Sequence, residues 1–409
     1  MRLLTVLVLA VALLVACSAP AAPAPTAAPP KPAAPAATSA PAAASPAAKP
    51  AASPAAAAPA ASPAAAASPA VSSSPSAAAS PAAAASPAAS ASTGMPPLPS
   101  AASKPSGPPE KLTLQLNWLR NVQFAGVFMA IDKGYYADEG IELETIIGGG
   151  QINTVQVVLA GGADIGIGGV EPLISGRVRA GDVRVLGAME QKSASALTCM
   201  PNSGIKSVKD LKGMKLGASA PQRPGLETLL KANDIMPEDV TIVTTGTGIE
   251  PLLSGQIDCR VTFATNEPIT MQLQGIDPIV LLNFDNGLQQ QGDPIFVTGE
   301  TLQKKEATLV RFMRATMRGW NYALTNPDET VDTIIAKFGE NLNREQQVLA
   351  LKAFGELIVT DHSRQNGLLA INRSSWEQAA QVMLDQQKID TPFDVDSILA
   401  PRVQEAARK

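Results

Sequence analysis

The feature that most limits how this chain can fold is a long segment of little besides Ala, Pro and Ser. It runs from Ser18 to about Pro109, and its repeated Ala-Ser-Pro-Ala units are of low complexity. Such a segment has little to bury except alanine methyl groups, and its prolines interrupt any helix that the alanines would favour. We therefore predict a disordered, semi-extended tether over residues 17–109 and a globular part over residues 110–409.

Residues 1–16 have the pattern of a cleaved export signal. One positive charge precedes an apolar run, residues 3–15, which is too short to span a bilayer. The sequence "LVAC" at 14–17 resembles the lipobox of bacterial lipoproteins, which implies cleavage before Cys17 and lipid attachment to it. The alternative is an ordinary signal peptide with an incidental cysteine. We expect a protein anchored by lipid on the extracytoplasmic side of the cell membrane.

The composition argues against several classes of function. The formal net charge is -4 without a basic cluster, which argues against a nucleic-acid partner. His362 is the one histidine and there is no Cys-x-x-Cys, so a transition-metal site or a histidine-based triad has little to be built from. We expect no metal and no cofactor. Besides Cys17 there are Cys199 and Cys259, and their spacing leaves open whether they form a disulfide or remain two buried thiols.

Short apolar runs alternate with helical segments after residue 110. The expected strands are 112–116, 141–146, 164–167, 183–188, 195–198, 215–219, 240–244, 260–264 and 278–282. Residues 309–324 have apolar side chains at helical spacing, and Asn326-Pro327 predicts the start of another helix. This alternation predicts an α/β fold with mostly parallel sheets. Ligands of such folds bind beyond the carboxyl ends of the strands.

The turn after the first expected strand has an unusual composition. Only 4% of the chain is aromatic, yet Trp118 and Phe124 lie here among the amides of Asn117, Asn121 and Gln123. A flat ligand can stack on aromatic rings while amides hydrogen-bond to its edge. We therefore expect these five residues to contact a ligand.

Three further loops follow expected strands. Glycines at 148–150 and 166–169 each precede a helix start, where they let the backbone approach a ligand closely. A third loop, 265–268, contains Asn266 and Glu267. The run "TGTGIEP" at 245–251 has a proline at the third glycine position of a dinucleotide-binding fingerprint, so it indicates a turn.

Several segments, in order along residues 111–400, resemble one family of bacterial proteins. They are "LNWLRNVQFAGVFMAIDKGYYADEGIELE", "GGADIGIGG", "GIKSVKDLKGMKLGAS", "LLSGQIDCRVTFATNEP" and "RATMRGWNYALTNPDE". They resemble the solute-binding proteins of the nitrate/sulfonate/thiamine-pyrimidine-precursor family. The resemblance implies a type II periplasmic-binding fold, in which two α/β lobes joined by two crossing strands clamp a ligand by hinge closure. It places lobe I at 110–197 and 295–409 and lobe II at 198–294, and implies a monomer that delivers its solute to an ABC permease.

The acidic residues expected at the site favour a neutral ligand. Glu171 opens the helix after the 166–169 loop and Glu267 lies in the 265–268 loop. Carboxylates repel anions such as sulfonate or nitrate and accept hydrogen bonds from N–H donors. Two known ligands of the family qualify, riboflavin and the aminopyrimidine precursors of thiamine. Phe124 stands where pyrimidine-binding members often carry histidine, and a second apolar ring suits a larger ring system, so we predict riboflavin, with an aminopyrimidine as the alternative.

Other residues have weaker claims to a ligand contact. We expect Gln123, Gln191, Gln222 and Asn266 to contact a polyol tail. Glu171 has an alternative role as a cap of its own helix, and Glu267 as part of a structural turn.

We predict a receptor without catalysis. Eukaryotic relatives on this fold make the thiamine pyrimidine by consuming an active-site histidine with iron and pyridoxal phosphate, and the histidine and the cysteine cluster that this chemistry needs are missing from the sequence. A ligand-sensing lipoprotein without a permease is the remaining alternative.

Overall fold

The computed structural model describes residues 94–97, 99, 105–179, 181–246 and 248–409. The predicted signal peptide, the lipid attachment at Cys17 and the tether up to residue 93 lie outside the described residues. None of the described helices is long and apolar enough to cross a membrane.

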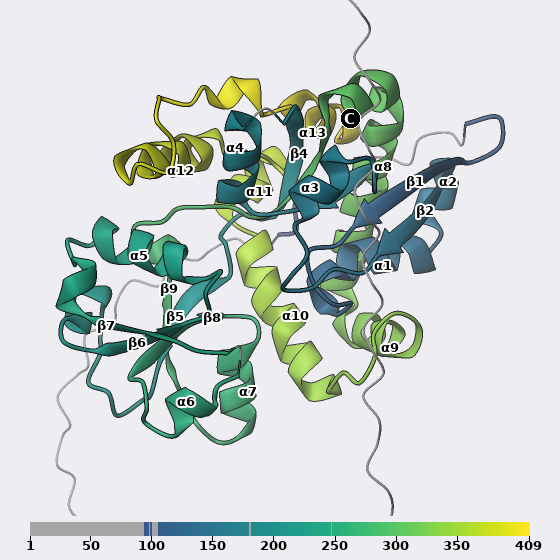
Figure 1. Cartoon of the computed structure of the whole chain (residues 1–409). Helices are drawn as coiled ribbons and strands as arrows, with labels where there is room; N and C mark the ends of the chain where they lie inside the picture. The colour runs from purple at the N-terminus through teal and green to yellow at the C-terminus, as the bar shows by residue number, and fades with distance from the viewer. Residues whose placement is uncertain (1–93, 98, 100–104, 180, 247) are drawn as a thin grey trace, which may run out of the picture. The chain divides into compact units, whose positions relative to one another are not determined.

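Two five-stranded sheets form the centres of two α/β lobes (Figure 1). The first sheet has the order β2 (Ile141–Ile146), β1 (Glu110–Gln115), β3 (Ile165–Ile167), β10 (Gly292–Thr298) and β4 (Val183–Glu190). The second has the order β7 (Thr241–Thr244), β6 (Lys215–Ala218), β8 (Cys259–Phe263), β5 (Ser195–Cys199) and β9 (Ile279–Leu282). All nine strands predicted from the sequence are present, with ends that differ by at most two residues, and the predicted α/β class is confirmed.

Both sheets are mixed, but four of the five strands in each run in the same direction, so the prediction of mostly parallel sheets is confirmed. β10 runs antiparallel to β3 and β4, and β5 runs antiparallel to β8 and β9. These are the two strands with which the chain enters a sheet after crossing from the other. The crossings lie at 191–194 and 283–291, and the expected lobe limits, after 197 and after 294, fall just beyond them, inside β5 and β10.

The helices of the first lobe pack around its sheet. Helices α1 (Ala125–Asp132), α8 (Gly299–Thr325), α9 (Pro327–Lys337), α10 (Arg344–Ile358) and α13 (Pro401–Ala407) contribute to the larger of its two cores. Helices α3 (Thr154–Leu159), α4 (Val170–Val178) and α12 (Arg373–Asp385) contribute to the other. Two short helices, α2 (Tyr135–Asp138) and α11 (Asp361–Asn366), complete this lobe. The predicted helix start at Pro327 is confirmed, although the Asn326 side chain donates to the Tyr322 carbonyl at the end of α8.

In the second lobe, α5 (Arg223–Ala232) packs on one face of the sheet, and α6 (Glu250–Leu253) and α7 (Glu267–Leu273) pack on the other (Figure 1). Cys199 and Cys259 are directly opposite each other in the β5–β8 pair and form a disulfide. This bond settles the question that their spacing left open. It closes a loop between residues 60 positions apart, and such a cross-link restricts the unfolded chain.

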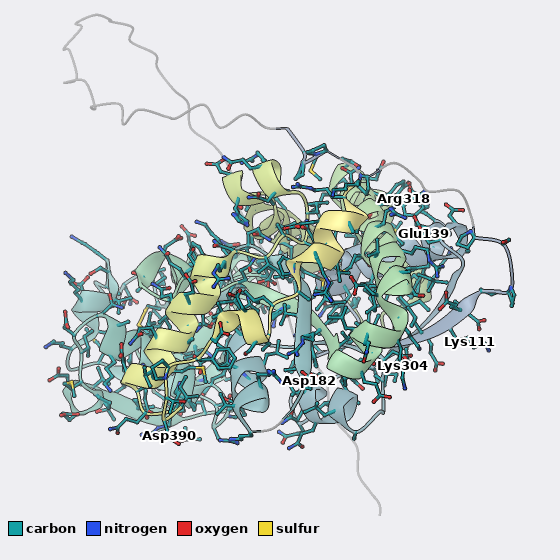
Figure 2. The ribbon with its side chains drawn as sticks, turned by 90° about the horizontal axis from the view of Figure 1, so that it is seen from above. Lys111, Glu139, Asp182, Lys304, Arg318 and Asp390 are labelled. Atoms are coloured by element: carbon teal, nitrogen blue, oxygen red, sulfur yellow. A yellow bond between two sulfur atoms is a disulfide. The ribbon has the colours of Figure 1, made fainter. Side chains whose placement is uncertain are left out.

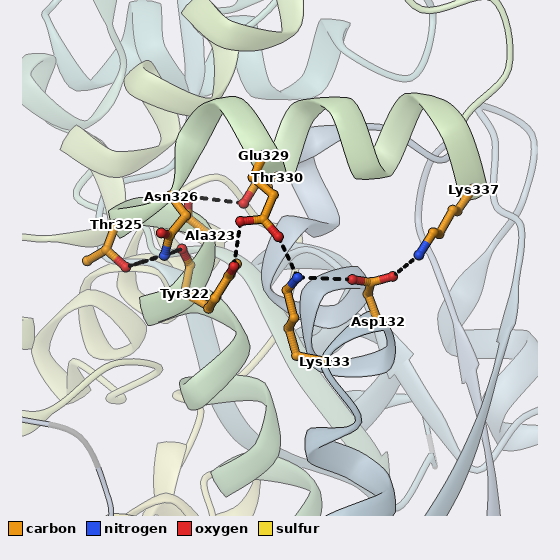
Figure 3. Close-up of polar contacts among 9 residues, drawn as sticks. All are labelled: Asp132, Lys133, Tyr322, Ala323, Thr325, Asn326, Glu329, Thr330 and Lys337. Carbon is orange, nitrogen blue, oxygen red and sulfur yellow. Dashed lines mark hydrogen bonds and ion pairs between the residues drawn. The ribbon is translucent and has the colours of Figure 1, made fainter.

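Ion pairs and a hydrogen bond connect α1, α8 and α9 at the surface of the first lobe. Figure 3 shows Lys133, just after α1, between Asp132 and Glu329 of α9. Glu329 also accepts a hydrogen bond of 2.6 Å from Tyr322 of α8. A buried ion pair lies between the end of α2 and α8: Glu139, labelled in Figure 2, is fully buried, and its carboxylate lies 2.9 Å from Arg314.

Candidate functional site

The turn that follows β1 brings two predicted amides onto an acid of β10. Asn117 donates to Asp293 Oδ1 at 2.7 Å, and Gln123 donates to Asp293 Oδ2 at 2.8 Å. Gln123 also donates to the Asn117 side-chain oxygen at 3.2 Å. Asn121 has a local role, because its Oδ1 accepts from the Gln123 backbone N–H at 2.7 Å and caps the short helical turn 122–124. The amides are therefore held in fixed orientations at the carboxyl end of β1.

Trp118 is the exposed aromatic ring of this turn. Its relative exposure is 37%, and the ring lies over Gly150, where an added Cβ would be 3.3 Å from it. Gly148 donates its N–H to the Trp118 carbonyl at 3.1 Å, and a Cβ there would be 2.2 Å from the Leu116 carbonyl oxygen. The sequence predicted that the 148–150 glycines approach a ligand. In the structure they seat the tryptophan turn instead.

Phe124 does not offer its ring to a ligand in this structure, which corrects the prediction made for it. The side chain is fully buried, and its ring packs edge-on against Phe128 with centroids 6.1 Å apart. The physical reason is that Phe124 immediately precedes α1, whose first turns are buried in the core against α8 and α9. A phenyl ring at a helix start gains more by filling a core than by remaining exposed.

The two predicted acids are both engaged by neighbouring groups. Glu171, in the first turn of α4, pairs with Lys388 at 2.9 Å and accepts a longer hydrogen bond from Gln290 at 3.4 Å. Glu267, in the first turn of α7, accepts the Phe263 N–H at 2.9 Å, and burial raises its pKa. A carboxylate paired with lysine repels anions less than an unpaired one, so Glu171 supports a neutral ligand less strongly than the sequence suggested.

The three remaining predicted polar residues also have partners within the protein. Gln191 is buried, donates to the Ala370 carbonyl at 3.1 Å and accepts from Gln291 at 3.0 Å, so its predicted contact with a polyol tail does not fit its position. Gln222 accepts from Ser219 at the start of α5. Asn266 accepts from Gln346 of α10 at 3.0 Å, a contact between the lobes. Ligand contacts of Gln222 and Asn266 remain predictions.

Three residues near the candidate site were not among the predicted site residues. Asp293 and Glu190 lie in β10 and at the end of β4, beside the crossings between the lobes. Phe263 ends β8, is 48% exposed, and pairs in register with Ser195, which directly follows the first crossing. The crossings of a two-lobed fold border its ligand site, which could have indicated these residues, but β10 was not among the expected strands.

Two surface hollows, of about 340 and 280 Å³, lie elsewhere on the protein. The first is lined by Gln272, Gly275, Ile276 and Asp277, and the second is lined mainly by residues beside β3 and the start of α8. Neither is lined by a predicted site residue. The candidate site is therefore defined by the strand ends at the crossings, where Trp118, Asn117 and Asp293 lie together.

The chain is similar in sequence and in fold to known proteins. Residues 121–330 match the sequence model of the family described as NMT1/THI5 like. The riboflavin-binding protein RibY of Chloroflexus aurantiacus is 29% identical over 319 residues, which cover 73% of this chain and 87% of that protein. A formylaminopyrimidine-binding protein of Halalkalibacterium halodurans is 21% identical and covers 56% of this chain and 72% of its own length.

Enzymes are also among the relatives. The 4-amino-5-hydroxymethyl-2-methylpyrimidine phosphate synthase of Schizosaccharomyces pombe is 22% identical over 63% of this chain and 82% of that protein. Among solved structures, the periplasmic aliphatic sulphonate binding protein SsuA of Escherichia coli superimposes with a TM-score of 0.59. Its identity is 15%, and the match covers 72% of this chain and 93% of that one. This similarity establishes the two-lobed periplasmic-binding fold.

Proposed function

Because the chain belongs to the NMT1/THI5-like family, we propose that it is the solute-binding receptor of an ABC importer and that its solute is riboflavin. The observation that carries the proposal is the exposed Trp118 ring, seated on Gly150 beside a fixed set of amides. The similarity to a riboflavin-binding protein at 29% identity supports the choice of ligand. Flat heterocycles stack on such rings, with about 0.5–1.5 kcal/mol gained beyond the burial of area.

Phe263 takes the place in this proposal that the sequence gave to Phe124. It is an exposed ring on the second lobe, at the carboxyl end of β8 and next to the first crossing. Trp118 lies beyond the carboxyl end of β1 in the first lobe. A ligand that contacts one ring from each lobe favours the closed arrangement of the lobes, since only contacts with both can shift that equilibrium.

Delivery to a permease follows from the same proposal. The lipid at Cys17 would hold the receptor on the extracytoplasmic side of the cell membrane, and the tether of residues 17–109 would let the folded part reach the permease. We propose a receptor and not an enzyme, because two of the three cysteines form a disulfide and His362, on α11, bonds to Asn366.

An aminopyrimidine precursor of thiamine is the second candidate ligand. The burial of Phe124 favours it, because the argument for a larger ring system depended on that second ring. A relative that binds formylaminopyrimidine supports the same choice.

A thermal-shift screen of the full-length protein tests the proposal. The ligands are riboflavin, 4-amino-5-hydroxymethyl-2-methylpyrimidine, taurine and nitrate, each at several concentrations. A ligand that binds only the folded state raises the melting temperature by mass action. At a ligand concentration one hundred times Kd, the free energy of unfolding increases by about 2.7 kcal/mol. We expect riboflavin to stabilise the protein most. Stabilisation by taurine or nitrate alone would refute the proposal.

A further inference from the structure

Two acidic residues of neighbouring strands lie close enough for their charges to interact, where the chain crosses between the lobes. Glu190 is the last residue of β4, and its register partner in β10 is Gly292, which directly precedes Asp293. A Cβ at Gly292 would be 1.9 Å from Glu190 Oε2, so only glycine leaves room for this carboxyl. Glu190 is 4% exposed and accepts the Ala194 N–H, in the first crossing, at 2.9 Å.

Asp293 is held in a strained and partly exposed position. Its φ is +48°, a region that non-glycine residues adopt at a cost, and such strain concentrates at functional sites. Asn117 and Gln123 each donate to one of its oxygens, at 2.7 and 2.8 Å. Each carboxyl oxygen has two lone pairs, so a ligand can still be recognised after both amides have bonded.

In the described part of the chain, no lysine, arginine or histidine nitrogen lies within ion-pair distance of either acid. The charged groups on the flanking segments have other partners: Lys192 pairs with Asp285 at 2.9 Å, and Glu171 pairs with Lys388 at 2.9 Å. The turn after β1 donates only side-chain amide hydrogen bonds to Asp293, and the first crossing donates only a backbone N–H to Glu190.

Burial acts on both acids in the same direction. It raises the pKa of Glu190 well above its usual range, and the charge of Asp293 raises it further. Burial also raises the pKa of Asp293, although the hydrogen bonds from Gln123 and Asn117 lower it. Two neighbouring carboxyl groups without a cation hold one proton more tightly than either would alone.

We propose that Asp293, with Glu190 behind it, is the specificity-determining acid of the site, and that one proton held by the pair takes part in ligand recognition. A carboxyl that carries this proton offers one donor beside one acceptor. It therefore matches a heterocycle that presents one N–H beside one acceptor, as a cyclic imide does, or an amino group beside a ring nitrogen, as an aminopyrimidine does. This inference rests on the proposed function and names the ligand edge that the site reads.

Glu190 is a positioning residue in this proposal, since it acts through Asp293. The charge of Asp293 and burial keep the proton on Glu190 to higher pH. Replacing Glu190 by glutamine removes this proton and leaves only Asp293 to titrate, so the pH dependence of binding should move to lower pH. We expect affinity to be highest while the pair holds its proton and to fall as pH rises through its ionisation.

The test uses riboflavin and N3-methylriboflavin, with flavin fluorescence quenching by the full-length protein from pH 5 to pH 9. N3-methylation removes the imide N–H and leaves the ring face unchanged. We expect the unmodified protein to bind the methylated compound at least about tenfold more weakly, because a buried acceptor loses its donor. In Asp293→Ala we expect the two compounds to bind equally, and in Glu190→Gln we expect the pH profile to move to lower pH.

The outcomes separate this inference from the proposed function. If riboflavin binds and N3-methylation changes nothing, Asp293 does not read the imide edge and the inference fails while the function stands. If riboflavin does not bind but the aminopyrimidine does, the affinity for the aminopyrimidine is measured over the same pH range. An unchanged affinity in Asp293→Ala then refutes the inference. If neither compound binds, the proposed function fails and the inference fails with it. The comparison of the two flavins needs no variant, so it remains decisive even if Asp293→Ala does not fold.

Discussion

At the scale of single residues, the two aromatic side chains of one turn have opposite positions. Trp118 and Phe124 are six positions apart, and the same polar surroundings predicted a ligand contact for both. The structure exposes Trp118 by 37% and buries Phe124 completely. The sequence contained the reason, because Phe124 begins the apolar stretch of α1, whereas Trp118 is preceded and followed by polar or exposed residues.

Replacing Trp118 by alanine should weaken riboflavin binding by about 2–4 kcal/mol, as the loss of a central aromatic anchor does. The fold should be retained, because the indole is partly exposed and its loss leaves no cavity in a core. Isothermal calorimetry measures the affinity and circular dichroism checks the fold. Val178→Ala, at an exposed apolar residue ending α4, is the control and should bind as the unmodified protein does. Equal affinities of Trp118→Ala and this control would remove Trp118 from the site.

The pH dependence of stability gives a second prediction at this scale. Burial raises the pKa of Glu190 in the folded state, so the fold prefers the protonated form. Its contribution is fully present below the unfolded pKa and is lost as pH rises through the raised value. Glu190→Gln removes this loss, so its melting temperature relative to the unmodified protein should increase from pH 5 to pH 9. A constant difference over this range would show that Glu190 titrates normally.

At the scale of secondary-structure elements, the sequence predicted every strand except β10. Its "GDPIFVT" starts with a glycine, an acid and a proline, which indicate a turn, and only its last part is apolar. Pro294 lies near the start of β10 opposite Ala188 of β4, and the register with β4 shifts only after it, between Ile295 and Phe296. Missing this strand concealed Asp293, and with it the partner that fixes Asn117 and Gln123. Asn117 and Gln123 do lie beyond the carboxyl end of β1, but their contact with a ligand stays a prediction. Their contact with Asp293 spans at least 170 positions of the chain, so no local sequence pattern indicates it.

The disulfide between β5 and β8 gives a prediction for these elements. The double variant Cys199→Ala and Cys259→Ala should lose about 4 kcal/mol of unfolding free energy, as expected for a closed loop of this length. Urea denaturation of the variant and of the unmodified protein measures the loss. Ligand affinity should stay unchanged, since both sulfurs are buried in the second lobe's core with α5. A denaturation midpoint equal to that of the unmodified protein would mean that the cross-link adds nothing to the neighbouring strand pairing.

At the scale of the whole folded part, side chains far apart in the sequence join the two lobes. Lys388, after α12, binds Glu171 of the first lobe and Thr228 of α5 in the second, both at 2.9 Å. Gln346 of α10 donates to Asn266 and to Thr270 of α7, both at 3.0 Å. Bonds of this kind exist only when the lobes are close, so they stabilise the arrangement in which a ligand contacts both lobes.

Thr228→Val should therefore weaken ligand binding without touching the ligand. The substitution keeps the shape of the side chain but removes the hydroxyl that Lys388 and Gln386 share, while Glu171 keeps its lysine. Loss of each such hydrogen bond costs about 1 kcal/mol, so the loss of both is roughly a thirtyfold shift in the closing equilibrium and in affinity. Stopped-flow fluorescence should place the change in the dissociation rate, and small-angle scattering should show a larger mean radius for the variant alone. Thr241→Val, at an exposed threonine of β7 in the same lobe, is the matched control. If Thr228→Val binds ligand as tightly as this control, the contacts between the lobes do not take part in closure, and affinity depends on the rings and on Asp293 alone.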